Sequence, residues 1–258
     1  MADYESLSKN HRQWIRRLHR RKYRSTEKLF IAEGIHALTE ARAGSRYPIT
    51  EIIVEGGRAG SIRDRLPDGI PIYRCSEQDM KAISTEETPQ GVVIVCREQE
   101  SRFDDLSVRF PAVMLYLDRI ADPGNLGTII RTAAWFDSPA VILSPSCVDP
   151  FNTKVIRASA GSIFRTELYR SIAPERLSRF AKQNNCRLIA AVPEGGTPVY
   201  RLERGDRDII LLGQEASGLS QEVMNCAAEC VSIPGTGNVE SLNLAVAAAI
   251  ILYERARP

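Results

Sequence analysis

The chain has 258 residues, of which 43% are hydrophobic and 26% charged, and its formal net charge is +2 at pH 7. These values are those of a soluble globular protein large enough for one domain or two. No apolar run reaches the roughly 20 residues that a membrane-spanning helix needs. The first residues, MADYESLSKN, also lack the apolar stretch of a secretory signal. We therefore expect a cytoplasmic protein with no membrane partner.

Basic residues are concentrated near the N-terminus, where residues 9–28 carry nine Lys or Arg and one acidic residue, Glu27. A helix is expected over residues 6–22, beginning at Ser6 or Ser8. Arginines spaced four residues apart then form one stripe, and the apolar residues between them fall on the other side. Such a stripe favours a polyanionic partner, with a merely solvated helix face as the alternative. The four arginines are Arg12, Arg16, Arg20 and Arg24.

The rest of the N-terminal region alternates strands and helices. The expected elements are a strand at FIAEG (30–34), a helix at 35–43, a strand at 49–54, short helices at 60–66 and 77–83 around a strand at 70–74, and a strand at 92–96. The turn Thr88-Pro89-Gln90-Gly91 precedes the last strand. This pattern predicts a small α/β domain over residues 1–96.

A polar stretch at 97–110, with seven charged residues between Arg97 and Arg109, is the expected linker. Beyond it, strands and helices alternate regularly, which predicts a doubly wound, mostly parallel α/β domain over residues 111–258. The expected strands lie at 112–117, 140–143, 165–169, 188–192, 208–212 and 230–233, and the expected helices at 125–136, 152–160, 174–184 and 241–254.

The cysteines do not suggest a metal site. Of the six, only Cys226 and Cys230 are close in sequence, and no histidine pair has the spacing of zinc ligands. We therefore expect free thiols in a reducing compartment and no bound metal.

Three loops at the expected carboxyl ends of strands carry polar residues and glycines. In an open parallel sheet ligands bind at this edge, and glycines allow the backbone to approach a ligand closely. The loops lie at 117–127, 213–219 and 233–243. The three loops together indicate a ligand site.

Several residues of these loops also have ordinary structural explanations. Asn125 and Ser241 are each suited to cap the helix that follows. Arg131, near the second turn of its helix, is equally suited to a surface ion pair. Spacing alone favours these structural roles for Asn125 and Arg131.

Taken together, the motifs D-x-x-x-D-P-x-N-x-G-x-x-x-R-T-A, G-x-E-x-x-G-L and I-P-x-x-G-x-V-E-S-L-N resemble those of the SpoU (TrmH-like) family, in the family's order, over residues 117–254. The N-terminal domain resembles the family's substrate-binding domain more weakly, through FIAEG and TPQGVVIV. The resemblance implies an S-adenosylmethionine-dependent RNA ribose 2′-O-methyltransferase. It also implies a SPOUT-type fold with a C-terminal trefoil knot and a homodimer whose partners complete the active site.

The resemblance further assigns roles to single residues. The implied catalytic residues are Asn125, Arg131, Glu215, Ser241 and Asn243, and the implied cofactor-binding residues are Gly213, Ile233, Gly237 and Leu242. Arg131 is the family's candidate general base, but an arginine is effectively always protonated, so a phosphate anchor is an equal alternative. Gly235 and Ala245 depart from the family's usual methionine and serine.

Other functions remain open at this point. Ribosomal RNA is the preferred substrate and transfer RNA the alternative, with the basic stripe as the RNA-binding surface and no DNA expected. A non-catalytic RNA-binding protein is the second hypothesis. A dinucleotide- or nucleotide-dependent enzyme ranks last, because no G-x-G-x-x-G follows residues 112–117 and no P-loop motif occurs.

Overall fold

The computed structural model describes residues 5–44, 46–58, 60, 62, 65–67, 69–106 and 112–257. Contacts divide the chain into two compact units: Met1–Gln99 with Asp149–Arg165, and Glu100–Val148 with Thr166–Pro258. Residues 149–165 therefore group with the first unit, whereas the expected limits place them in the domain over residues 111–258. The expected domain limits stay a prediction. Residues 61, 63 and 64 of the helix expected at 60–66 lie outside the described residues, as do residues 107–110 of the linker.

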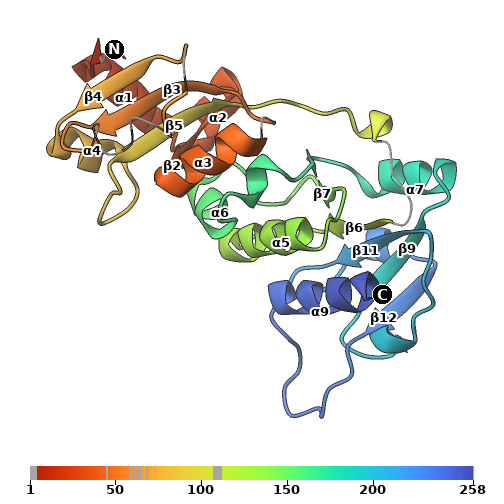
Figure 1. Cartoon of the computed structure of the whole chain (residues 1–258). Helices are drawn as coiled ribbons and strands as arrows, with labels where there is room; N and C mark the ends of the chain where they lie inside the picture. The colour runs from red at the N-terminus through yellow and green to blue at the C-terminus, as the bar shows by residue number, and fades with distance from the viewer. Residues whose placement is uncertain are drawn as a thin grey trace. The chain divides into compact units, whose positions relative to one another are not determined.

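The first unit contains a five-stranded mixed sheet (Figure 1). Its strands are β1 (Glu5–Ser6), β2 (Leu29–Glu33), β3 (Ile49–Glu55), β4 (Ile72–Cys75) and β5 (Val92–Arg97). They lie in the order β1-β4-β3-β5-β2. β4 pairs in parallel with β1 and β3, whereas β5 runs antiparallel to β3 and β2.

Helices cover both faces of this sheet. They are α1 (Lys9–Arg17), α2 (Arg21–Glu27), α3 (Ile35–Gly44), α4 (Glu77–Ile83) and α6 (Thr153–Ala158). On one face, Ile15 of α1 and Met80 of α4 share a buried cluster with Ile31 of β2. On the other, α3 and α6 contact β2, and Phe30 stacks on Phe151 with 4.6 Å between ring centroids. This aromatic contact ties the unit's second segment to its sheet.

The single helix expected over residues 6–22 is wrong, because α1 ends at Arg17 and α2 begins at Arg21. Of the two expected caps, Ser8 is confirmed, because its hydroxyl accepts the N–H of His11 at 3.2 Å and caps α1, whereas Ser6 belongs to β1. The break follows α1 directly, and tertiary hydrogen bonds stabilise it.

Arg24 supplies those bonds and is only 4% exposed. Its Nη1 donates to the carbonyls of Leu18 at 2.9 Å and His19 at 2.7 Å, and its Nε donates to Asp149 Oδ2 at 3.0 Å. A buried guanidinium requires such partners. Arg24 therefore belongs to the interior of the first unit, and its expected place on an exposed basic stripe is wrong.

The second unit contains a parallel sheet, as expected. Its strands are β6 (Ala112–Leu117), β7 (Val141–Leu143), β8 (Leu168–Tyr169), β9 (Arg187–Ala191), β10 (Thr197–Pro198), β11 (Arg207–Leu212) and β12 (Glu229–Ser232). Their order is β10-β12-β9-β11-β6-β7-β8, and all of these pairs run parallel. β11 lies between β9 and β6, so the loops that follow β6 and β11 emerge side by side at the carboxyl edge.

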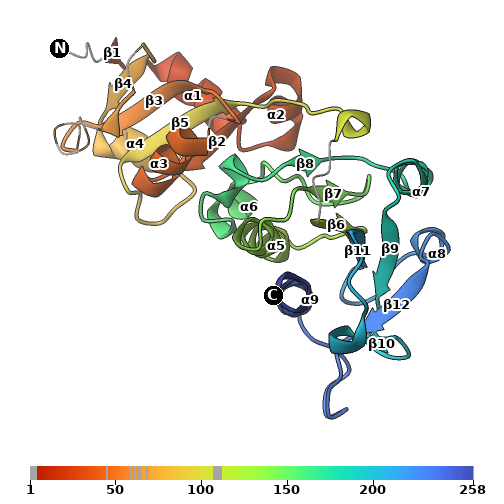
Figure 2. The ribbon, with the colours of Figure 1, turned by 45° about the vertical axis from the view of Figure 1, so that its right-hand side comes forward.

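Two layers of helix cover this sheet (Figure 2). The helices are α5 (Pro123–Trp135), α7 (Pro174–Gln183), α8 (Gln221–Met224) and α9 (Leu244–Ala256), with short 3-10 turns at Phe103–Asp105 and Val199–Arg201. Leu177 of α7 and Val223 of α8 pack with Met114 and Ile209 of the strands on one face. α5 and α9 contact one another on the other face. Within the described ranges, no helix has the length and apolar character to span a membrane.

Candidate active site

The loops that follow β6, β11 and β12 bring three polar side chains together. Asn125 Nδ2 donates a hydrogen bond to Glu215 Oε1, and Asn243 Nδ2 donates to Asn125 Oδ1 at 2.9 Å. At the carboxyl edge of the sheet, Glu215 and Asn243 are exposed and Asn125 is half-buried. We call Asn125, Glu215 and Asn243 the amide–carboxylate cluster. It unites three of the five residues expected to be catalytic.

Asn125 is available to this cluster because another residue caps its helix. Asp122 Oδ1 accepts the backbone N–H of Asn125 at 2.7 Å, and Pro123 occupies the first helical position, where no N–H is needed. The explanation of Asn125 as a helix cap is therefore wrong. Its side chain points to Glu215 and Asn243 instead.

This assignment predicts unequal effects of two alanine substitutions. Asp122→Ala removes the cap of α5 and should lower the free energy of unfolding by about 1 kcal/mol. Asn125→Ala leaves the cap in place and should cost less than about 0.5 kcal/mol, because the side chain is only half-buried and does not cap the helix. Urea titrations followed by circular dichroism measure both values. Equal losses in the two variants would contradict the assignment of the cap to Asp122.

Asn243 caps the last helix, which begins at Leu244, three residues later than expected. Its Oδ1 accepts the backbone N–H groups of Ala245 at 2.9 Å and Val246 at 3.3 Å, while its Nδ2 reaches Asn125. Ser241 therefore does not cap α9. One side chain thus both starts the helix and orients the cluster.

The loop that carries Glu215 is a tight turn. Backbone hydrogen bonds join Gln214 and Gly218 in both directions, at 3.1 and 2.8 Å. Gly218 has φ +64°, and a Cβ on Gly213 would lie 2.2 Å from the Gly218 carbonyl carbon. A side chain at Gly213 is therefore excluded, and Glu215 is held on a rigid support.

Asp118, which the sequence did not single out, connects the first two loops. It is 3% exposed, and its Oδ2 accepts the N–H of Ser220 at 2.7 Å. Its own N–H donates to the carbonyl of Leu212 at 2.8 Å. It is the first Asp of the D-x-x-x-D-P motif, so the motif spacing was the available signal. Asp118 positions the loop of Glu215 relative to α5.

Arg131 is exposed on α5, past Asn125. The surface ion pair that spacing favoured is absent: in the described part of the chain, Arg131 makes no ion pair or hydrogen bond. Its guanidinium is therefore available to an external anion.

The third loop is exposed from Pro234 to Asn243 and extends away from the sheet (Figure 1). Ser241 and Gly237 lie in it, Leu242 is 43% exposed, and Ile233 is half-buried. No hydrogen bond joins these residues to the cluster within the described ranges. A Cβ on Gly237 would meet no atom within 4 Å, so the loop backbone is open to a ligand.

The site offers a carboxylate, carboxamides, apolar side chains and open backbone at one edge. Such a set suits a ligand that has apolar surface, hydrogen-bonding groups and a positive charge. Among the described residues, no group of three or more His, Cys, Asp or Glu side chains could hold a metal ion.

Comparison with known families identifies the class of protein. Residues 112–253 match the model described as the SpoU rRNA Methylase family, and residues 11–94 match that of the MRM3-like substrate binding domain. Fold, site and family models together define an RNA methyltransferase. The chain belongs to the SpoU rRNA methylase family.

Known relatives match nearly the whole chain. The 23S rRNA (guanosine(2553)-2′-O)-methyltransferase RlmP of Bacillus subtilis is 31% identical over 238 residues, 92% of each chain. A TrmH-family RNA methyltransferase structure from Porphyromonas gingivalis has a TM-score of 0.84 at 30% identity, covering 96% of this chain and 98% of that one. The structure of the AdoMet-bound rRNA methyltransferase of Sinorhizobium meliloti has a TM-score of 0.87 at 28% identity. The match covers 97% of this chain and 95% of that one.

Proposed function

We propose that the protein transfers a methyl group from S-adenosylmethionine to a ribose 2′-hydroxyl of ribosomal RNA. The observation that carries this proposal is the amide–carboxylate cluster, which joins all three family loops. The relative from Bacillus subtilis, a 23S rRNA 2′-O-methyltransferase that aligns with 92% of this chain, supports ribosomal RNA over transfer RNA.

The proposed cofactor site lies on the second and third loops. Gly213, Ile233, Gly237 and Leu242 hold the adenosine, the glycines through backbone atoms and the other two with apolar side chains. Glu215, Ser241 and Asn243 form the polar wall. When bound, S-adenosylmethionine supplies an electrophilic methyl group on a sulfonium. The protein itself contributes mainly position and electrostatics, since methyl transfer needs an aligned oxygen.

Arg131 acts on the RNA. A guanidinium stays protonated at neutral pH, so its role is to bind the phosphate next to the target ribose and to stabilise negative charge developing on the 2′-oxygen. Asn125 orients the ribose. Arg131 is exposed and has no hydrogen bond or ion pair among the described residues, so its guanidinium is open to an RNA phosphate, which supports the anchor over a general base.

The reaction is tested by incubating the protein with labelled S-adenosylmethionine and unmodified RNA, with ribosomal and transfer pools kept separate. We expect label in the ribosomal pool alone. Label in the transfer RNA pool alone would show that transfer RNA, not ribosomal RNA, is the substrate. If the protein failed to bind S-adenosylmethionine, the non-catalytic RNA-binding alternative would be favoured.

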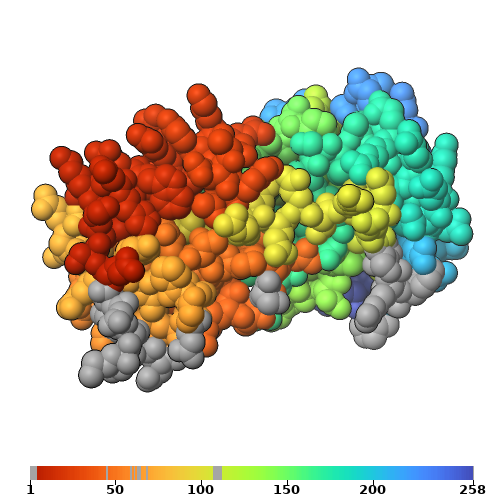
Figure 3. Space-filling model, turned by 90° about the horizontal axis from the view of Figure 1, so that it is seen from above, coloured from red at the N-terminus to blue at the C-terminus, as the bar shows by residue number. Residues whose placement is uncertain are grey.

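The first unit supplies the RNA-binding surface. Arg12 forms an ion pair with Asp79, and Arg24 is buried, so Arg16 and Arg20 remain exposed from the expected stripe. Residues 5–28 form a continuous part of the surface (red in Figure 3). The other exposed cations of this surface are Lys9, Arg17, Arg21, Lys22 and Lys28.

Neutralising Arg16 and Arg20 together should weaken RNA binding without altering which RNA is preferred. The double variant Arg16→Gln/Arg20→Gln should reduce the slope of log K against log salt by about 2, since each lost phosphate contact removes about 1. Fluorescence anisotropy over a salt series measures the slope. The matched control is Arg179→Gln/Lys182→Gln on α7, where both side chains are exposed. Equal slopes for the two double variants would contradict this surface.

A homodimer through α5 and α9 is part of the same proposal. Trp135 on α5 is 84% exposed, and Tyr253 and Val246 on α9 are 54% and 47% exposed. Large apolar side chains gathered on contacting helices are typical of an interface. Sedimentation velocity should therefore find a dimer at micromolar concentration, and Trp135→Glu should shift it to monomer. A monomeric parent protein would contradict the proposal.

The proposed trefoil knot is supported by chain order. β12 lies beyond β9 in the sheet, yet α9 packs on α5, the helix that follows β6. The chain must therefore return past the loops that follow β9 and β11.

Action on ribosomal RNA also supports a cytoplasmic location.

A further inference from the structure

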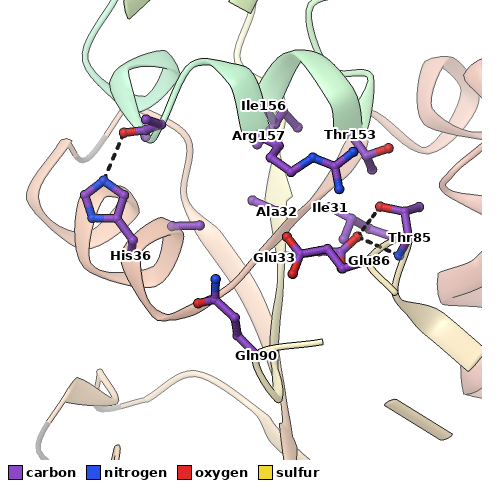
Figure 4. Close-up of a pocket in the computed structure, with 13 residues that line it drawn as sticks. Ile31, Ala32, Glu33, His36, Thr85, Glu86, Gln90, Thr153, Ile156 and Arg157 are labelled. Carbon is purple, nitrogen blue, oxygen red and sulfur yellow. Dashed lines mark hydrogen bonds between the residues drawn. The ribbon is translucent and has the colours of Figure 1, made fainter. Parts of the chain in front are cut away.

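A second site lies within the first unit, away from the family's three loops. A cavity of about 180 Å³ opens between the end of β2, the start of α3, the segment after α4, and α6 (Figure 4). Its lining includes the buried apolar residues Ala32, Ala37 and Ile156. A 150 Å³ apolar cavity can admit benzene, so this volume suits a planar ring.

One carboxylate at the cavity already has all its partners. Glu33 Oε1 accepts the backbone N–H of Thr85 at 3.0 Å and its hydroxyl at 2.7 Å, and Glu33 Oε2 accepts the hydroxyl of Ser84. Glu33 therefore shapes the wall and is not free to bind a ligand strongly.

Three other polar side chains line the cavity without such partners. Those of Glu86, Gln90 and Arg157 make no hydrogen bond or ion pair in the described part of the chain. Arg157 reaches from α6 toward the carboxylates, and Gln90 comes from the opposite side (Figure 4). Burial, together with the neighbouring Glu33, raises the pKa of Glu86. A carboxylate in such surroundings favours a ligand that donates hydrogen bonds.

We propose that this cavity binds one unpaired guanine of the RNA, with Glu86 reading its pairing edge, Gln90 its carbonyl, and Arg157 its phosphate. A carboxylate only accepts hydrogen bonds, and guanine presents two adjacent donors, N1–H and the 2-amino group. The amide of Gln90 can donate to O6. Unpaired bases held on their edges are the usual basis of sequence-specific RNA recognition.

This inference rests on the proposed function for its ligand class, RNA, but not on catalysis. The probes are single-stranded RNA pentamers with U, G or inosine at the centre and uridine elsewhere. Inosine retains N1–H and O6 but lacks the 2-amino group. The basic surface of α1 and α2 binds all three pentamers alike, so the ratio of their affinities reports the cavity.

The 258-residue chain should bind the guanine pentamer about ten-fold or more tightly than the uridine pentamer, as a bidentate contact provides. Inosine should lose most of this preference. Glu86→Gln should abolish the preference for guanine, since the NH2 group of the new amide would face one of the two hydrogen-bond donors of the base. The control Glu87→Gln changes an exposed neighbour that does not line the cavity, and it should keep the preference.

The phosphate contact has its own matched pair on α6. Arg157→Gln should weaken binding of the guanine and uridine pentamers unequally, with a larger loss for guanine. Lys154→Gln, exposed on the same helix and outside the cavity, should weaken both alike.

Equal affinity of the parent protein for all three pentamers would overturn the proposal, as would a guanine preference that survives in Glu86→Gln with the native circular dichroism spectrum. Methyl transfer to ribosomal RNA is measured in parallel. Methyl transfer without a preference for guanine would refute guanine binding in the cavity and leave the proposed reaction standing. Guanine preference without transfer would refute the proposed reaction and leave the cavity standing.

Discussion

Replacing Arg131 with alanine should reduce kcat for RNA methylation by about 10²–10³-fold, the usual effect of removing one group that stabilises charge in a transition state. Binding of S-adenosylmethionine should change little, because Arg131 makes no hydrogen bond or ion pair with the described residues of the cofactor loops. Single-turnover methyl transfer and equilibrium dialysis measure the two quantities.

Arg131→Lys distinguishes the role of the charge from that of the guanidinium. A phosphate anchor should keep partial activity with lysine, since the positive charge remains, though the bidentate geometry is lost. The control Arg179→Ala removes an exposed arginine on α7 and should leave kcat unchanged. Parent-like turnover in Arg131→Ala would remove this residue from the mechanism altogether.

Replacing Asp208 with asparagine should destabilise the second unit by about 3–5 kcal/mol, the cost of removing one partner from a buried ion pair. Asp208 is fully buried in β11 and binds two arginines. Arg187 Nε donates to its Oδ1 at 2.8 Å, and Arg255 of α9, only 8% exposed, donates to its Oδ2. The substitution leaves the charge of Arg255 buried beside a neutral amide.

Hydrogen exchange locates this loss and contains its own control. Amides of β11 and β9 should lose protection in Asp208→Asn, whereas those of β3 and β5 in the first unit should keep it. Asp104→Asn removes a carboxylate from an exposed pair with Arg176 and should change neither region. Unchanged protection of β11 in Asp208→Asn would contradict a structural role for the buried network.

The sequence predicted the parallel sheet and the family because both depend on local pattern. Apolar strands followed by polar, glycine-containing loops place their functional residues at one edge, and the family assignment is confirmed. The meeting of Asn125, Glu215 and Asn243 follows from strand order, with β11 next to β6. The roles assigned to these residues stay a prediction.

The failures of prediction involve residues far apart in sequence. The break between α1 and α2 depends on Arg24, whose carboxylate partner Asp149 lies 125 positions away. A four-residue arginine spacing gives no sign that one member turns inward. The two-residue strands β1 and β10 are too short for any hydrophobic period to appear.

Cap positions were mistaken for a different reason. Asp122 and Asn125 both suit the start of α5, and both Ser241 and Asn243 suit that of α9. Composition does not separate such neighbours, whereas the hydrogen bonds of the folded chain do. The same bonds free Asn125 for the site.

The most direct test of the proposed reaction is the chemical position of the transferred methyl group. Ribosomal RNA labelled by the protein would be hydrolysed in alkali, which cleaves only where the 2′-hydroxyl is free. A ribose methylated at the 2′-oxygen resists cleavage, so we expect the label in a dinucleotide. Label released entirely in mononucleotides would place the methyl group on a base and contradict ribose methylation.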